Sequence, residues 1–333
     1  MKSVVYGAGA IGSILGATLR NAGHEVVLVA RPKHVIAIRE HGLEVKGVEE
    51  FTIEIDATTE PDCVEEADIV FLTVKTQDTK QAVEEFSSHL GKSTPVVSLQ
   101  NGIRNPEFIS EIIGKERVIP GVVRFTASYL QPGVIEYTRT GPCIIGRFDG
   151  EKTSRMKKIC EYMSSGIMTE VSTNIEGDMW AKLVLNLINL PMTLTGLGFP
   201  RGLKNRYFQQ CLIATWEEGH NVVKESGIKP TYRILDQLIR VLKDDSLFEA
   251  WFDQERNSIE TYPSTLQSLI RGSSDESEYL TGEIIRLGEE IGLVTPVNSL
   301  LMRKFQGMTE TGIIEYIPAE KLWGSIAEVL SSI

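Results

Sequence analysis

The chain opens with the stretch that decides its fold, Val4-Val5-Tyr6-Gly7-Ala8-Gly9-Ala10-Ile11-Gly12. A short β-rich run leads into the pattern G-x-G-x-x-G, and a helical pattern continues to about Ala22. In such a strand–turn–helix the first glycine makes the tight turn, the second lets the backbone approach a pyrophosphate, and the third lets helix and strand pack closely. The helix N-terminus adds free N–H groups and a positive dipole. The motif predicts a Rossmann-type dinucleotide site, against the alternative of a glycine-rich turn without a ligand.

The end of the second predicted strand bears on the choice between NAD and NADP. This strand covers 25–29, and the residues that follow are Ala30, Arg31, Pro32, Lys33 and His34. An NAD enzyme usually carries an acidic residue here for the ribose 2′-OH, whereas this chain carries two cations and no acid. Because a guanidinium can bind a 2′-phosphate through two hydrogen bonds, Arg31 predicts NADP(H) as the cofactor. The alternative is a surface arginine at the start of a helix.

Short β-rich runs alternate with helical patterns through the first half of the chain. Apolar runs at 69–73 and 96–99 are typical of parallel strands, and the alternation predicts a doubly wound sheet. Residues 118–146 contain short β runs separated by Pro-Gly and Gly-Pro turns, which predict antiparallel strands that extend the sheet. A helix at 153–164 and a strand at 168–171 would close this domain.

The β signals fade after about Asn174, and long helical patterns follow. These patterns cover 178–190, 209–226, 232–242, 276–291 and 295–305. Thr295-Pro296 has the N-cap-then-proline signature of a helix start. The sequence of 333 residues therefore predicts an α/β protein of two domains. Residues 1–173 would form an NADP-binding Rossmann domain with an antiparallel extension, and residues 174–333 an all-helical domain for substrate binding and dimerisation.

Composition excludes several other classes of function. The net charge of −11 argues against a general surface for nucleic acid or acidic membranes. The longest apolar stretch, 183–199, is interrupted by two asparagines and a proline, and predicts a buried helix and its exit but no membrane span. The N-terminal apolar run is too short for a signal peptide. The four cysteines are far apart and form no C-x-x-C pair, which indicates free thiols in the cytoplasm and neither a metal site nor a disulfide framework.

Two polar segments follow predicted strands, at the sheet edge where such folds bind ligands. They are Val74-Lys75-Thr76-Gln77 and Gln100-Asn101-Gly102. The two segments make Lys75 and Asn101 candidates for ligand binding. A solvated lysine and an ordinary Asn-Gly turn are equally supported alternatives.

The helix predicted at 178–190 carries a polar stripe on a mostly apolar surface. Asp178, Lys182, Asn186 and Asn189 follow at spacings of four, four and three, on one face. Asparagine is a poor helix former, so two of them here favour an interdomain cleft over a solvated face with an Asp–Lys pair. Hydride delivery to a ketone creates alkoxide charge on its oxygen, which a lysine ammonium can stabilise and protonate. Lys182 is therefore the candidate catalytic residue.

Together these features resemble the ketopantoate reductase (2-dehydropantoate 2-reductase) family over nearly the whole chain. The segments that carry the resemblance are, in order, GAGAIG from Gly7, Arg31, VKTQ around Lys75, QNG around Asn101, WAKLVLN around Lys182, STLQ from Ser264, Glu276 before Tyr279 and Gly282, and GLVTPVN over 292–298. The resemblance implies NADPH-dependent reduction of 2-dehydropantoate, a small 2-oxo acid, to (R)-pantoate on the route to pantothenate and coenzyme A.

The resemblance also implies roles for single residues. Lys182 would give the proton to the substrate carbonyl, and Asn101 would contact both nicotinamide and substrate. Asn186 would hydrogen-bond the substrate, and Ser264 would bind its carboxylate end.

Three residues would act on the cofactor side in such a protein. Glu276 would help to hold the cofactor and organise the catalytic site. Lys75 would lie along the cofactor, and Ala127 would contact it through its backbone. The helical domain would supply a homodimer interface.

This chain departs from the family pattern where the family faces its substrate. Leu190 stands where an asparagine is common, with Asn189 one place early, and Thr261 replaces the asparagine of an Asn-x-x-Ser segment. The usual Ser-Met reads Ser264-Thr265. These departures leave two alternatives open: a related NADP-dependent reductase of another 2-oxo acid or carbonyl compound, and a non-catalytic NADP(H)-binding redox regulator.

Overall fold

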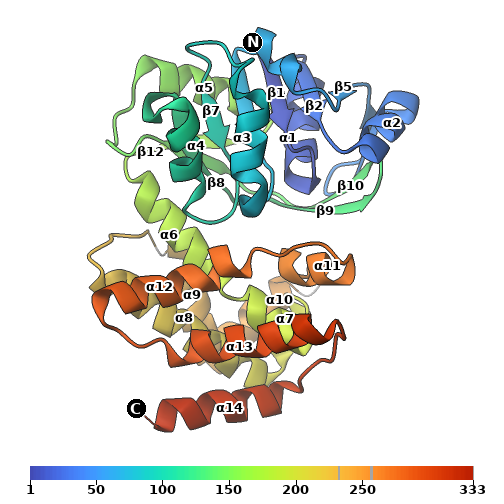
Figure 1. Cartoon of the computed structure of the whole chain (residues 1–333). Coiled ribbons are helices and arrows are strands. Elements are labelled where there is room, and N and C mark those ends of the chain that lie inside the picture. Colours follow the sequence, from blue (N-terminus) through green and yellow to red (C-terminus); the bar gives the residue numbers. More distant parts are fainter. Residues whose placement is uncertain (232, 256–257, 333) are drawn as a thin grey trace. The chain divides into compact units, whose positions relative to one another are not determined.

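A computed structural model of the chain describes residues 1–231, 233–255 and 258–332. The chain forms two compact units, residues 1–179 and 180–333, so the division lies within helix α6 (Ile175–Asn186), six residues after the predicted boundary at 173. The predicted fold class is confirmed, because an α/β unit with a mainly parallel sheet precedes a helical unit (Figure 1).

The main sheet of the first unit has the strand order β12-β11-β8-β7-β6-β1-β2-β5. Every neighbouring pair is parallel except β8 and β11, which are antiparallel. The strands are β1 (Lys2–Tyr6), β2 (Glu25–Val29), β5 (Asp56–Thr58), β6 (Ile69–Leu72), β7 (Val96–Ser98), β8 (Val118–Val123), β11 (Cys143–Gly146) and β12 (Thr169–Ser172). The central strands β1, β2, β6 and β7 are those that the apolar runs predict.

The predicted antiparallel extension is only partly correct. The β8–β11 pair does extend the main sheet, but the middle of the segment leaves it. There β9 (Thr126–Gln131) and β10 (Val134–Arg139) form a hairpin in a second sheet of order β4-β3-β10-β9. Its other strands are β3 (Leu43–Gly47) and β4 (Phe51–Ile53). The prediction is wrong only for β9 and β10, because it missed the β3–β4 hairpin, whose strand β3 pairs with β10.

Helices cover both faces of the main sheet, as the alternation of side chains along β1 requires. Val5 packs on the face covered by α1 (Ala10–Asn21) and α5 (Ser154–Ser164). Val4 packs on the opposite face, under α3 (Thr79–Ser87) and α4 (Asn105–Ile113), where Phe86 and Ile109 are fully buried. Helix α2 (Pro32–His41) follows β2 (Figure 1).

The second unit contains the C-terminal half of α6 and the helices that follow it. They are α7 (Asn189–Thr195), α8 (Arg206–Glu225), α9 (Arg233–Lys243), α10 (Asp245–Glu255), α11 (Ser264–Ile270), α12 (Thr281–Ile291), α13 (Pro296–Thr311) and α14 (Ala319–Ser331). Leu194, Cys211, Leu301, Phe305 and Leu322 form a core among α7, α8, α13 and α14.

Two predicted helices differ from the structure. The helix predicted at 178–190 ends at Asn186, and α7 begins at Asn189. The cause is Pro191, which lacks an N–H and whose ring would clash with the carbonyl four residues earlier in a continuous helix. The helix predicted from Glu276 begins at Thr281 and follows a 3₁₀ turn at Ser277–Tyr279. Tyr232, the predicted start of the helix at 232–242, lies outside the described residues.

Candidate functional site

The glycine-rich turn has backbone geometry that requires glycine at its first and third positions. Gly7 has a φ of +97°, and a Cβ there would lie 2.5 Å from Val74 Cγ1. A Cβ on Gly12 would lie 2.4 Å from the Thr73 hydroxyl oxygen. The turn is therefore pressed against the segment that follows β6, and α1 against the sheet, as expected for the motif.

The second glycine of the turn faces open space. A Cβ on Gly9 would meet no atom closer than the Gly7 carbonyl oxygen, at 3.9 Å. The first helical backbone bond is made by Ser13, whose N–H donates to Gly9 O at 3.0 Å. The N–H groups before it have no partner within the helix, and the first turn carries no acidic residue. A pyrophosphate fits this cradle sterically and electrostatically.

Arg31 lies at the end of β2, at the N-cap of α2, with extended backbone angles. Its side chain is exposed, and no residue in the described part of the chain pairs with the guanidinium. The first turn of α2 contains no acidic residue and carries Lys33, which is also exposed. An anion at this position would meet two cations and no competing carboxylate.

A buried hydrogen-bond network joins the two polar segments that follow β6 and β7. Gln100 Nε2 donates to the Val74 carbonyl at 3.0 Å and to the Thr79 hydroxyl at 2.6 Å. Thr79 in turn donates to Asn105 Oδ1 at 2.7 Å. The Asn105 amide donates to the Asn101 carbonyl at 2.7 Å, so the network ends at the backbone of a predicted site residue.

The same network fixes the backbone beside Lys75, which precedes the 3₁₀ turn Thr76–Asp78. The Thr76 hydroxyl donates to the Asn101 carbonyl at 3.1 Å and accepts from the Asn105 amide at 3.2 Å. Thr76, Thr79 and Asn105 are nearly or fully buried, whereas Lys75 and Asn101 are half-buried. The structure thus brings Lys75 and Asn101 together at the carboxyl edge of the sheet, beside the glycine-rich turn that contacts Val74.

Ala127 lies on β9 in the second sheet, opposite Tyr137 of β10. It is half-buried against the core that includes α1. Its strand belongs to the second sheet, whereas Gly7, Lys75 and Asn101 follow strands of the main sheet.

Lys182 and Asn186 lie one turn apart on α6, and both are half-buried. The neighbouring Val184 and Leu187 are fully buried. Leu187 packs where Gly219 of α8 leaves room, since a Cβ on that glycine would lie 2.4 Å from Leu187 Cδ1. The apolar side of this helix is thereby held against α8.

The other two members of the predicted polar stripe behave differently. Asp178 belongs to the first unit, where it accepts a hydrogen bond of 2.5 Å from Ser172 and lies 3.9 Å from the Arg124 guanidinium. Asn189 begins α7, a separate helix, so it does not continue the face of Lys182. The predicted single stripe of four residues is therefore wrong beyond Asn186.

Ser264 is the first residue of α11 and is exposed. The chain before it is fixed at Thr261, whose N–H and C=O pair with Phe199 at 2.8 and 3.0 Å. The Thr261 hydroxyl points back to the same residue and donates to Phe199 O at 3.4 Å. Thr261 is one of the departures from the family pattern, and its hydroxyl is bonded to the backbone of Phe199.

Glu276 is buried, with 8% of its surface exposed. The sequence predicts it on the face of a helix, but it precedes the 3₁₀ turn, and its carbonyl accepts from the Tyr279 N–H at 3.0 Å. Ser277, Thr281 and Glu283 beside it are also buried.

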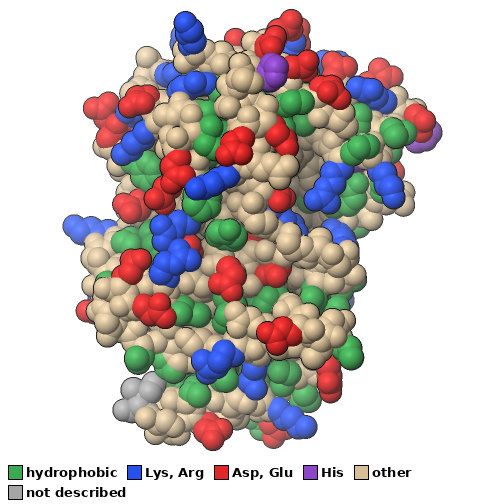
Figure 2. All heavy atoms as spheres, in the orientation of Figure 1, with side chains coloured by type: hydrophobic (Ala, Val, Ile, Leu, Met, Phe, Trp, Pro, Cys, Tyr) green, Lys and Arg blue, Asp and Glu red, His purple; other side chains and the backbone are tan. Residues whose placement is uncertain are grey.

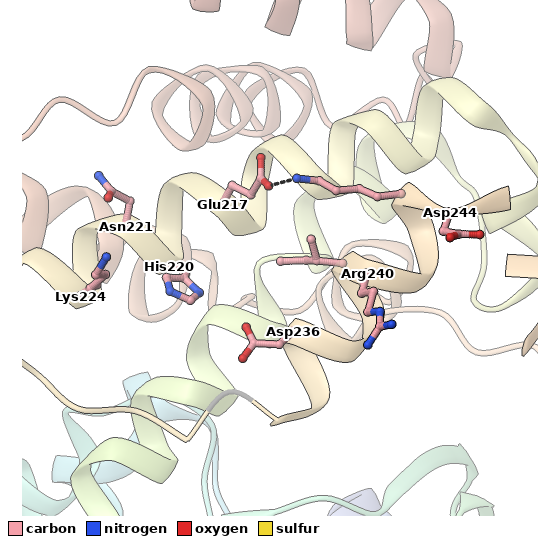
Figure 3. A pocket seen from close by; sticks show the side chains of 9 residues that line it. Glu217, His220, Asn221, Lys224, Asp236, Arg240 and Asp244 are labelled. Carbon is pink, nitrogen blue, oxygen red and sulfur yellow. Dashed lines mark hydrogen bonds and ion pairs between the residues drawn. The ribbon is translucent and has the colours of Figure 1, made fainter. Parts of the chain in front are cut away.

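A groove of about 700 Å³ lies between α8 and α9 (Figure 3). Its charged and polar lining includes Glu217, His220, Lys224, Asp236 and Arg240, and none of the predicted site residues. Acidic side chains balance the basic ones, so the groove has no charge preference for a 2-oxo acid.

Three residues with clear structural roles were not identified from the sequence. Asn105 organises the network described above, Glu218 of α8 accepts from the backbone N–H groups of Val297 and Asn298, and His34 bonds to both α1 and the β9–β10 turn. Each of them directly follows a charged residue in the sequence, so no local pattern distinguishes it or identifies its partner.

On the face shown in Figure 2, acidic and basic side chains are interspersed. Among the described residues, no helix combines the length and apolarity needed to cross a membrane. Nor do His, Cys, Asp and Glu side chains gather there in a group of three or more that could hold a metal ion.

The fold and the glycine-rich turn define a class, that of proteins with a Rossmann-type dinucleotide-binding domain and a helical C-terminal domain. Residues 3–150 match the family model described as "Ketopantoate reductase PanE/ApbA", and residues 174–309 match its C-terminal counterpart. The chain belongs to the ketopantoate reductase family, so the resemblance seen in the sequence is confirmed.

Individual relatives agree with this assignment. The chain is 34% identical to the 2-dehydropantoate 2-reductase of Pyrococcus abyssi over 310 residues, which cover 92% of this chain and 97% of the relative. A ketopantoate reductase structure from Ralstonia eutropha matches with a TM-score of 0.79 at 30% identity, over 94% of this chain and 99% of that one. The structure of D-mandelate dehydrogenase with NADH and anilino(oxo)acetate matches with a TM-score of 0.81 at 25% identity, over 94% and 99%.

Proposed function

We propose that this protein reduces 2-dehydropantoate to (R)-pantoate with NADPH as the electron donor, on the route to pantothenate and coenzyme A. The observation that carries the proposal is the half-buried pair Lys182 and Asn186 on one face of α6, in a chain of the ketopantoate reductase family. The names of the relatives supply the substrate.

The residues of the first unit would hold the cofactor. The open cradle at Gly9 would take the pyrophosphate, and Arg31 would pair with the 2′-phosphate. Lys75, positioned by the buried network, would lie along the cofactor, and Asn101 would contact both nicotinamide and substrate. The Ala127 backbone would be a further contact from this unit, and Glu276 of the second unit would help to hold the cofactor.

The residues of the second unit would carry the chemistry on the substrate. Bound NADPH supplies the hydride that reduces the carbonyl carbon. The Lys182 ammonium would hydrogen-bond the carbonyl oxygen and transfer its proton as negative charge develops there. Asn186 would hydrogen-bond the substrate and Ser264 would bind its carboxylate end, while Glu276 would help to organise the site.

The test is oxidation of NADPH by the purified protein with and without 2-dehydropantoate, with NADH in parallel. Rapid oxidation that requires both NADPH and 2-dehydropantoate is the expected result. NADPH binding without turnover of this substrate would contradict the substrate assignment and leave the cofactor assignment intact.

A second candidate is a reductase of another 2-oxo acid. It is favoured by the likeness to D-mandelate dehydrogenase and by Thr261, whose hydroxyl is bonded to Phe199 O. A panel of 2-oxo acids compared by kcat/KM separates the two candidates, because a wide preference for 2-dehydropantoate would exclude the second.

The proposal extends to assembly and location. The helical unit would form a homodimer interface, as the resemblance implies, and the four separate cysteines favour the reducing cytoplasm. Sedimentation of the purified chain gives the oligomeric state, and fractionation of cells gives the location.

A further inference from the structure

The His34 imidazole is the centre of a buried relay in the first unit. The backbone N–H of Gly133, in the β9–β10 turn, donates to Nδ1 at 2.9 Å, and Nε2 lies 3.2 Å from the Ser13 hydroxyl. A backbone N–H can only donate, so Nδ1 carries a lone pair and the neutral ring carries its proton on Nε2. The ring therefore donates to Ser13, whose own proton goes to the Ala8 carbonyl at 3.2 Å.

The relay is well enclosed. His34 is 2% exposed and Ser13 is fully buried, and the Tyr129 ring lies 5.0 Å from the imidazole, centroid to centroid. Burial lowers the pKa of His34 to about 4, so the ring is neutral at pH 7 and Nδ1 can accept from Gly133. Donor and acceptor are thus defined for each hydrogen bond of the relay.

The relay runs from the β9–β10 turn through the His34 ring on α2 to the glycine-rich turn, and so joins the helix that Arg31 caps to the turn that would hold the pyrophosphate. Ala8 is inside the glycine-rich turn, and its N–H donates to Val29 O at 2.8 Å. The ring itself belongs to the first turn of α2, where the backbone N–H of His34 donates to Arg31 O at 2.9 Å, so the imidazole stands three residues after the residue that caps this helix. The reaction proposed above assigns no role to His34.

We propose that His34 is a positioning residue that sets Arg31 and the Ala8 turn at a fixed spacing, so that one dinucleotide can occupy both with its 2′-phosphate and its pyrophosphate. The inference rests on the proposed NADP(H) binding. Because NADPH engages both elements and NADH only the turn, a loss of the relay should affect NADPH more than NADH.

The experiment measures the dissociation constants of NADPH and NADH by calorimetry, without turnover, for the wild type and three variants. His34→Leu keeps the apolar volume and removes both hydrogen bonds, and should weaken NADPH roughly tenfold and NADH less. His34→Gln offers one donor and one acceptor, and should recover most of the NADPH affinity. Tyr162→Phe is the matched control, because it removes another buried hydrogen bond of this unit, to Ser3 at 2.8 Å, and should leave both constants unchanged.

Each outcome decides the inference. Unchanged NADPH affinity in a folded His34→Leu variant overturns the inference. An equal loss of NADPH affinity in the Leu and Gln variants also overturns it. So does an equal loss of affinity for NADPH and NADH in His34→Leu. If His34→Leu does not fold, Ser13→Ala interrupts the same relay with the ring retained, and unchanged NADPH affinity there overturns it as well. A wild-type protein that binds no NADPH would overturn the proposed cofactor itself and the inference with it.

Discussion

The side-chain amide of Asn105 donates a hydrogen bond of 2.7 Å to the backbone carbonyl of Asn101. This bond joins the first residue of α4 to the loop after β7. Since Asn105 is fully buried and also bonds Thr76 and Thr79, its amide is the junction of the network. The positions of Lys75 and Asn101 therefore depend on a residue outside both polar segments.

Replacing Asn105 by alanine should lower the free energy of unfolding by about 2–3 kcal/mol, because buried donors and acceptors on Thr76, Thr79 and Asn101 lose their partner. Denaturant unfolding monitored by circular dichroism measures this change. Asn221→Ala, at an exposed position on α8, is the control and should change stability by less than about 0.5 kcal/mol. Equal effects of the two substitutions would show that the network contributes nothing specific.

Much of the sheet could be predicted, because its central strands are short apolar runs between helical patterns. The strands β3, β4 and β5 could not, since none of them is a continuous apolar run and each is partly exposed. The break after Asn186 was missed because periodicity continues across Pro191, although the ring cannot fit a continuous helix. Hydrophobic periodicity locates the apolar face of a helix, but it does not show that a proline ring within the pattern ends the helix.

The candidate site shows the same contrast. The glycine-rich turn was predictable because its spacing encodes its own geometry. The bond between Asn105 and Asn101 and the relay through His34 and Ser13 were not, because each joins side chains to partners whose positions depend on the finished fold. Ser264 and Glu276 became candidates through the family resemblance alone.

Arg31→Ala should weaken NADPH at least tenfold and leave NADH within about twofold, because a charge-assisted contact to the 2′-phosphate is lost and NADH has none to lose. Calorimetric titration of both cofactors measures the effect. Lys157→Ala, an exposed substitution on α5, is the control and should change neither constant. A parallel loss for both cofactors would mean that Arg31 does not recognise the 2′-phosphate.

Lys182→Ala should lower kcat by roughly 10²–10⁴-fold with 2-dehydropantoate, the usual range for loss of a general acid. Its NADPH dissociation constant and its thermal unfolding should stay near those of the wild type. The control is Lys224→Ala, an exposed lysine on α8 that lines the groove of Figure 3, which should keep full activity. Normal turnover in a folded Lys182→Ala variant would exclude the lysine as the proton donor.

Glu218 gives the second unit a predictable pH dependence. Its carboxylate accepts from Val297 N–H at 2.9 Å and from Asn298 N–H and Nδ2 at 2.8 Å each, and so caps α13 in place of the Thr295 side chain. Burial nevertheless raises its pKa above the ordinary value of 4.5, against the opposing effect of these hydrogen bonds. The folded protein therefore binds this proton more tightly than the unfolded chain does.

Because the folded pKa of Glu218 is the higher one, its contribution to stability is fully present below pH 4.5 and is lost as pH rises through the folded pKa. Glu218→Gln cannot titrate, so its free energy of unfolding should rise relative to that of the wild type over this interval, by about 1.4 kcal/mol for each unit by which the pKa is raised. Urea unfolding of both proteins between pH 4.5 and 8 measures the difference. Parallel pH profiles would show that this carboxyl has the same pKa in both states, in spite of its burial.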